Sequence, residues 1–190
     1  MNRKDVVFFT GAGISAESGI PTFQTQDEIR AKLTRAFANE RYIDYAETIK
    51  DMADICNNAE LNAAHLSIAM HNFQVITMNV DRLHSRAGSM DVIELHGTIP
   101  QTTDTIEDLI NSNIVLYGDI APEYNKAIKL VKNMPYDKGY FVIVGTSFYT
   151  EISNVLLKIA KQRHAKIIII NDNASTRVPD ICKYLMTQII

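Results

Sequence analysis

Hydrophobic residues along this chain gather in short, nearly unbroken runs that are separated by longer stretches of mixed polar and apolar residues. Runs of four or five residues that are rich in Val, Ile, Phe and Tyr, without polar alternation, are typical of strands covered on both faces. This pattern predicts strands over residues 6–9, 75–78, 92–95, 114–117, 140–144 and 166–170.

The stretches between these runs place apolar residues three or four positions apart, as an amphipathic helix does. In one of them Ile152, Leu156 and Ile159 share a helix face. The same spacing predicts helices over residues 27–38, 42–56, 62–70, 122–132 and 152–162.

Strands that alternate with helices predict an α/β fold with a doubly wound, Rossmann-like parallel sheet and right-handed crossovers. Two adjacent helices interrupt this alternation after the first strand. We therefore predict that residues 1–190 form a single domain with a small helical insertion at about residues 24–58. This insertion makes a reduced, mainly helical small lobe.

The first strand runs directly into a glycine turn, Gly11-Ala12-Gly13, and a predicted helix start. Two glycines let the backbone approach a diphosphate, and the free amides of a helix N-terminus favour negative charge. The spacing departs from the dinucleotide pattern GxGxxG because Gly19 comes too late, and no acidic residue closes a second strand about 20 residues on. From these residues alone, a phosphate site and a tight structural turn both remain open.

Polar residues follow the other predicted strands at the point where each strand ends. Asn79 and Asp81 follow the second strand and His96 follows the third, while Thr146 and Asn171 follow the last two. Ligands of doubly wound sheets bind beyond the carboxyl ends of the strands. A carboxamide, a carboxylate and an imidazole beside an anion cradle are more than a phosphate site requires, so this set predicts an active site.

Charge and cysteine content narrow the function classes. The formal net charge is −3 and basic residues are scattered, which argues against a nucleic-acid partner. The two cysteines, Cys56 and Cys182, form no CxxC pair, so we expect buried thiols, no metal site and a reducing, cytoplasmic location. No apolar run is long enough for a signal peptide or a membrane span, and we expect no membrane partner.

Several motifs follow one another in order: GAGIS at residues 11–15, NAAH at 62–65, TMNVDRLH at 77–84, HG at 96–97 and GTS at 145–147. Together they span most of the chain and resemble the motifs of the sirtuin family, whose members are NAD-dependent protein deacylases. Any one of these motifs can arise by chance, but their joint order makes the resemblance specific.

The resemblance implies NAD as the cofactor and an acylated protein or peptide as the substrate. It implies that His96 acts as general base on a ribose hydroxyl, which suits a side chain that titrates near neutrality. It further implies that Asp81 binds the nicotinamide carboxamide and that Asn79 orients the ribose and a water. The other residues it implies are Gly11, Ala12, Gly13, Ser15, Ile20, Phe23, Gly145, Thr146, Ser147 and Asn171 for the cofactor, and Leu116, Tyr117 and Gly118 for the substrate.

The chain departs from the family pattern in three ways. Thr22 and Gln24 flank Phe23 where the family commonly has Asp and Arg, so a cation near the phosphates is missing. Met78 stands where the family usually has Gln. The four zinc cysteines are absent and the segment 97–113 is too short for the usual zinc ribbon, so we expect no metal and a lobe held by helix packing.

Two other functions remain open at this stage. The chain could be an NAD glycohydrolase or ADP-ribosyltransferase, in which water or another side chain intercepts the sugar, or a non-catalytic module that binds NAD or ADP-ribose. Simpler roles also remain for individual residues: Asn79 and Asp81 can cap a helix, and His96 can be a turn histidine. We expect His65 and His84 to be structural.

Overall fold

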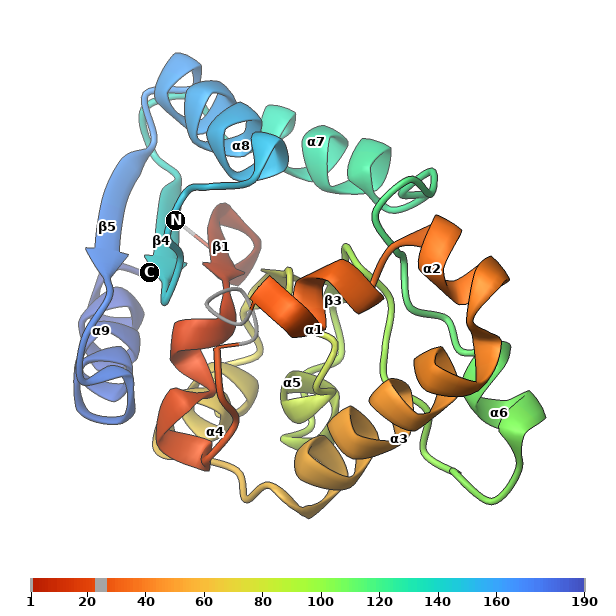
Figure 1. Cartoon of the computed structure of the whole chain (residues 1–190). Coiled ribbons are helices and arrows are strands. Elements are labelled where there is room, and N and C mark those ends of the chain that lie inside the picture. The colour runs from red at the N-terminus through yellow and green to blue at the C-terminus, as the bar shows by residue number, and fades with distance from the viewer. Residues whose placement is uncertain (1, 23–26, 190) are drawn as a thin grey trace.

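The computed structural model describes residues 2–22 and 27–189, which contain a five-stranded sheet (Figure 1). The strands are β1 (Val6–Thr10), β2 (Gln74–Thr77), β3 (Val92–Glu94), β4 (Tyr140–Val144) and β5 (Lys166–Ile170). Their order is β3-β2-β1-β4-β5, and every neighbouring pair is parallel. This confirms the predicted α/β, Rossmann-like fold. The chain changes direction of winding between β1 and β4, the point at which such sheets bind ligands.

Helices cover both faces of this sheet. They are α1 (Asp27–Lys32), α2 (Arg35–Glu40), α3 (Tyr42–Asn58), α4 (Ala63–Met70), α5 (Leu83–Arg86), α6 (Ile106–Ile110), α7 (Tyr124–Lys132), α8 (Glu151–Gln162) and α9 (Ala174–Gln188), with short 3-10 turns η1 (Arg3–Asp5), η2 (Ala12–Ile14) and η3 (Ala16–Ser18). None of the helices within residues 2–22 and 27–189 combines the length and apolarity needed to cross a lipid bilayer.

The residues of β1 serve the two faces of the sheet alternately, as the period of a strand requires. Val6 and Phe8 share one apolar cluster with α4 and α9, whereas Val7 and Phe9 share the other with α7 and α8. All four side chains are fully buried. The unbroken apolar run of β1 is therefore explained by cover on both sides.

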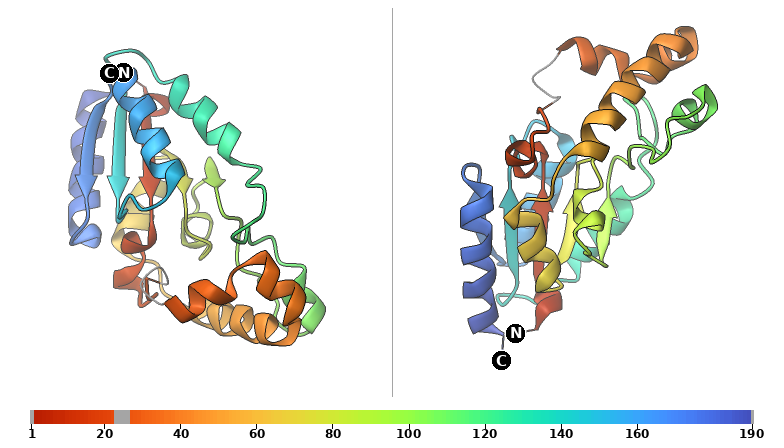
Figure 2. Two further views of the ribbon diagram at one scale, coloured as in Figure 1. Left: turned by 45° about the horizontal axis from the view of Figure 1, so that its top comes forward. Right: turned by 90° about the horizontal axis from the view of Figure 1, so that it is seen from below.

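A third apolar cluster holds together the small lobe, by which we mean α1, α2, α3 and α6. Tyr45, Ile49 and Met52 of α3 are buried in the same cluster as Ile99 and Leu109. Figure 2 shows the lobe on the side to which the arrowheads of β1 and β4 point. The limits of the helical insertion and the single-domain organisation stay predictions.

Residues 114–117 lie outside the sheet, so the strand predicted there is wrong. The Tyr117 N–H donates to the Leu33 carbonyl (3.0 Å), and the Tyr117 carbonyl accepts from the Arg35 N–H (2.9 Å). The segment therefore forms one parallel bridge with Thr34 of the lobe. Because Thr34 is extended (φ −100°, ψ 148°) and its hydroxyl caps α2, the single helix predicted over this part of the lobe is split into α1 and α2.

Two further elements differ from the prediction. The glycine turn after β1 leads into η2 and η3 rather than an α-helix, and η3 ends at Gly19, which has a left-handed φ of 83°. The helix α9 is absent from the predicted elements, and it contains Pro179 although proline usually ends a helix. Its buried residues are Ala174, Val178, Cys182 and Leu185.

Candidate active site

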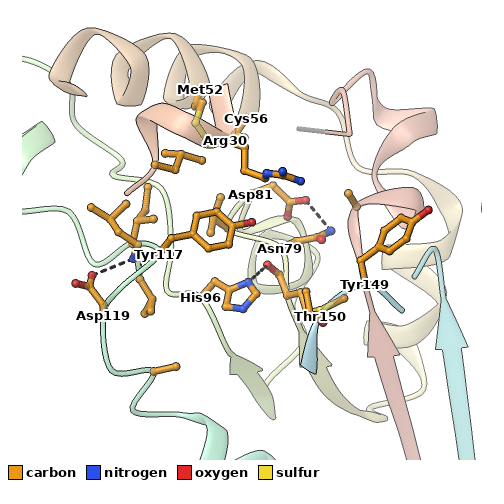
Figure 3. A pocket seen from close by; sticks show the side chains of 18 of the residues that line it. Arg30, Met52, Cys56, Asn79, Asp81, His96, Tyr117, Asp119, Tyr149 and Thr150 are labelled. Carbon is orange, nitrogen blue, oxygen red and sulfur yellow. Dashed lines mark hydrogen bonds between the residues drawn. The ribbon is translucent and has the colours of Figure 1, made fainter. Parts of the chain in front are cut away.

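A cavity of about 960 Å³ lies between the carboxyl ends of the strands and the small lobe. Figure 3 shows Asn79, Asp81 and His96 converging on it, with Met52 of α3 on the opposite side. The predicted site residues that line the cavity are Ala12, Ser15, Ile20, Asn79, Asp81, His96, Leu116, Tyr117 and Gly118. The fold thus brings the predicted catalytic residues and the predicted substrate segment to one place.

The other predicted cofactor residues lie at adjoining strand ends. These are Gly11 and Gly13 after β1, Gly145, Thr146 and Ser147 after β4, and Asn171 after β5, while Phe23 lies outside the described residues. The Gly13 N–H donates to the Gly145 carbonyl (3.0 Å), and a Cβ on Gly13 would lie 2.6 Å from the Gly145 Cα. The two turns therefore stack on each other as only glycine permits. Because the Gly13 amide is engaged in this contact, Ala12 is the residue of this turn that lines the cavity.

Asp81 is the centre of a polar network beside the cavity, and only 4% of it is exposed. Its Oδ2 accepts from the Ser15 hydroxyl (2.6 Å) and from the Asn79 side-chain amide (3.1 Å). Its Oδ1 accepts from the Leu83 N–H (2.9 Å) at the start of α5. Asp81 therefore accepts the first N–H of α5, although Arg82 is the N-cap residue, and it faces the site at the same time.

His96 is held in one tautomer by its hydrogen bonds. Its Nδ1 lies 3.1 Å from the Met78 carbonyl oxygen, which can only accept, so Nδ1 carries the proton and Nε2 keeps its lone pair. Burial lowers the pKa of His96 below its ordinary value of 6.5, although the bond to the Met78 carbonyl works against this shift. At neutral pH the imidazole is therefore neutral and able to accept a proton.

The backbone around Gly97 explains why a glycine follows His96. The φ of Gly97 is 71°, and a Cβ at this position would lie 1.6 Å from the Asn113 carbonyl oxygen. The chain can therefore pass close to Asn113 only with glycine at this position.

Two residues at the cavity were missed in the sequence. Tyr124, in the first turn of α7, donates its hydroxyl hydrogen to His96 Nε2 at 3.0 Å. Arg30 of α1 lines the cavity near Met52 and Cys56, and burial raises the pKa of the Cys56 thiol to about 12. The sequence gives little indication that either residue belongs to the site, because each lies in a stretch with the pattern of an ordinary amphipathic helix.

Comparison with known proteins identifies the family. A family model described as the Sir2 family matches residues 11–105. A protein from Archaeoglobus fulgidus named NAD-dependent protein deacylase 2 is 33% identical over 88% of this chain and 80% of its own length. The chain belongs to the Sir2 family. An Aquifex aeolicus protein named NAD-dependent protein deacylase is 29% identical over 95% of this chain and 90% of its own. The resemblance to sirtuins drawn from the motifs is thus confirmed.

Solved Sir2 structures share this fold. The crystal structure of a Sir2 homologue–NAD complex superposes with a TM-score of 0.83 at 24% identity, covering 96% of this chain and 89% of that one. A structure described as Sir2–p53 peptide–NAD⁺ gives a TM-score of 0.77 at 27% identity, covering 96% and 92%.

The structure shows what the Met78 side chain does in this Sir2 chain. The Met78 sulfur accepts from the Thr150 hydroxyl (3.2 Å) at the cavity wall. Among the described residues, no group of three or more His, Cys, Asp or Glu side chains could hold a metal ion.

Two buried histidines lie behind the site of this Sir2 protein. The rings of His65 and His84 meet edge to face with centroids 4.9 Å apart. His84 Nε2 lies 3.0 Å from the Thr10 hydroxyl, and His65 Nε2 lies 3.5 Å from the Ser15 hydroxyl. Burial lowers the pKa of His65 to about 4 and holds that of His84 well below 6.5.

We expect these histidines to make the stability of the protein fall steeply in mild acid. Above pH 6.5 they are neutral in both the folded and the unfolded chain, so their contribution to stability is fully present. His96 shares this property, because its pKa is lowered as well. Below pH 6.5 the unfolded chain binds protons at His65, His84 and His96 that the folded chain does not bind. Stability is therefore lost as the pH falls, by about 1.4 kcal/mol per pH unit for each histidine while the pH lies between 6.5 and the lowered pKa of that histidine, which for His65 is about 4.

Urea unfolding between pH 7.5 and pH 4.5 measures this slope. His84→Gln should flatten it, whereas His164→Asn, at an exposed position with φ 55°, should leave it unchanged. Equal slopes for the His84 variant and the wild type would contradict the assignment.

Proposed function

We propose that this chain is an NAD-dependent protein deacylase, which cleaves the nicotinamide–ribose bond and transfers the acyl group of an acyl-lysine to ADP-ribose. The observation that carries the proposal is the convergence of Asn79, Asp81 and His96 on one cavity beside the glycine turn. The named functions of the relatives from Archaeoglobus fulgidus and Aquifex aeolicus support it. A Sir2 structure described as holding 2′-O-acetyl-ADP-ribose and a deacetylated p53 peptide supports it as well.

The glycine turns fit NAD as the cofactor. Because Gly11 and Gly13 carry no side chain, a diphosphate can lie against the backbone of this turn, at the point where the winding of the sheet reverses. In our proposal Gly11, Ala12 and Gly13 form this cradle. Gly11 and Gly13 give the diphosphate room rather than amides, because their N–H groups donate to the Val144 and Gly145 carbonyls. The adenosine half is bound by the residues after β4 and β5, which are Gly145, Thr146, Ser147 and Asn171.

The reactive half of NAD is assigned to the polar network. Asp81, Ser15 and Ile20 bind the nicotinamide carboxamide, for which the Asp81 carboxylate is a natural acceptor of N–H groups. NAD supplies a ribosyl carbon that becomes electron-poor as nicotinamide leaves. Asn79 orients the ribose, and His96 accepts the proton of a ribose hydroxyl.

The substrate side is assigned to the segment Leu116, Tyr117 and Gly118, which lines the cavity opposite the glycine turn. We propose that an acyl-lysine enters here, with the half-exposed Tyr117 ring at the entrance. The lobe is proposed to be free of zinc and held by the packing of α3. The unpaired, buried cysteines support a cytoplasmic location, and the net charge of −3 supports a protein substrate rather than a nucleic acid.

One observation favours hydrolysis of NAD or ADP-ribosyl transfer as a second candidate. Three successive N–H groups of this segment already donate within the chain. Val115 donates to the His96 carbonyl, Leu116 to the Asp119 carboxylate and Tyr117 to the Leu33 carbonyl. An extended peptide therefore finds few free donors along this segment. Water or another nucleophile would then meet the sugar more readily.

Purified protein incubated with NAD, with and without a panel of acylated peptides, separates these functions. We expect nicotinamide release that depends on an acyl peptide, together with loss of the acyl mass from the peptide. Release without peptide would instead indicate a glycohydrolase, and a gain of ADP-ribose mass a transferase. Binding of NAD without release under all conditions would contradict every catalytic assignment.

A further inference from the structure

The Tyr124 hydroxyl is hydrogen-bonded to Nε2 of His96, the nitrogen proposed to accept a proton. The hydroxyl lies 3.0 Å from His96 Nε2, and the ring centroids are 6.0 Å apart. Because Nδ1–H is committed to the Met78 carbonyl, Nε2 can only accept, so the phenol is the donor. Both side chains line the cavity.

The position of Tyr124 is fixed by the helix that carries it. One and two turns further along α7, Ala127 and Val131 are fully buried against the sheet. The Tyr124 ring packs against the same apolar cluster, which limits the freedom of the hydroxyl. Burial raises the pKa of Tyr124 above its ordinary value of 10, and Glu151 and Tyr117 act in the same direction. The phenol therefore keeps its proton at neutral pH.

This arrangement has a direct consequence for the base. While the contact exists, a ribose hydroxyl cannot reach the lone pair of His96. The histidine then cannot accept the ribose proton directly, as the role assigned to it above requires. A phenol oxygen, however, can accept one proton while it gives up another. The tyrosine can thus connect a sugar hydroxyl to the imidazole without leaving its place.

We propose that Tyr124 is a proton relay between the ribose hydroxyl and His96, an inference that rests on the proposed deacylase function. The ribose O–H bond breaks and its proton passes to the Tyr124 oxygen, while the phenol proton passes to Nε2. The sugar oxygen keeps the electron pair and forms the new bond to the acyl carbon. As the acyl carbon–nitrogen bond breaks, the lysine nitrogen takes the proton back along the same route.

Tyr124→Phe in the full chain tests the relay, because it removes the hydroxyl and keeps the ring. We expect an unchanged melting temperature, NAD affinity within about twofold, and single-turnover acyl transfer slower by about tenfold or more. The matched control is Tyr149→Phe, since Tyr149 also lines the cavity but is 89% exposed. This control should keep the wild-type transfer rate. A Tyr124 variant that transfers the acyl group at the wild-type rate or faster would overturn the relay.

Two further measurements extend the test, the first without the variant and the second without turnover. In mixtures of H₂O and D₂O, a relay predicts that single-turnover transfer by the wild type depends on deuterium fraction with curvature, because two protons move together; a straight line would overturn it. In ¹⁵N NMR, the His96 Nε2 resonance should shift when the Tyr124 hydroxyl is removed, and an unmoved resonance would contradict the contact itself.

Wild-type protein that transfers no acyl group from any peptide contradicts the proposed function and the relay with it. An active wild type with an unimpaired Tyr124 variant contradicts the relay alone.

Discussion

Gly13→Ala is expected to destabilise the protein by about 3 kcal/mol, which is a fall in melting temperature of roughly 10 °C for a chain of this length. A Cβ at this position would lie 2.6 Å from the Gly145 Cα and 3.1 Å from the Gly145 carbonyl oxygen. These are backbone atoms, so they cannot rotate away. The ends of β1 and β4 must separate, and the proposed diphosphate cradle is lost with them.

Gly139→Ala is the matched control for this substitution. Its new Cβ would also meet a close neighbour, Met134 Cε at 2.9 Å, but that atom is the end of a flexible side chain. Neither glycine has a left-handed φ, so the comparison isolates the steric effect. Thermal unfolding and titration calorimetry with NAD measure the two consequences. Equal stability and NAD affinity in the two variants would show that the contact between the turns is unimportant.

His96→Ala is expected to slow deacylation by about 10²- to 10⁴-fold while NAD still binds with nearly the wild-type affinity. In the proposed reaction the imidazole accepts a proton, and its hydrogen bonds run to Met78 and Tyr124 rather than to the glycine turn. Removing it therefore takes away the base and leaves the cradle intact. Rate measurements at saturating NAD, together with calorimetry, separate the two effects.

Asp81→Asn is the informative contrast to this variant. The Asp81 carboxylate accepts from Ser15, Asn79 and Leu83. An asparagine has only one oxygen, so its amide nitrogen would face a donor, and the network proposed to bind nicotinamide must rearrange. We therefore expect both NAD affinity and turnover to fall. Full activity in either variant would refute the role assigned to that residue.

The sheet and most of its helices could be predicted because their signals are local. The runs of β1 and β4 are buried at every residue by cover on both faces, and the edge strands β3 and β5 keep the same apolar composition although they are only partly buried. The motif residues Asn79, Asp81 and His96 could be placed together because each directly follows a strand of one parallel sheet. The fold thus follows from the periodicity of the sequence, and the family from the resemblance of the ordered motifs.

The errors arise where a distant contact decides the local structure. Residues 114–117 have the composition of a strand, but their backbone pairs with residues 33–35 of the lobe, and the same contact splits the helix at Thr34. Tyr124 reads as an ordinary residue of an amphipathic helix, and only the packing of α7 on the sheet brings its hydroxyl to His96. Neither arrangement is visible in the spacing of residues.

The connection between the lobe and Tyr117 also bears on how a peptide could enter. Tyr117 makes two backbone hydrogen bonds to the lobe. Beside them Arg35 forms an ion pair with Asp119 through two contacts of 2.8 Å and 2.7 Å. Exposed ion pairs of this kind contribute at most about 1 kcal/mol to stability. A peptide that pairs with Tyr117 as an added strand has to exchange places with Leu33 and Arg35. Substrate capture and release of the lobe then become one equilibrium, in which rising peptide concentration should speed hydrogen exchange at the Arg35 amide.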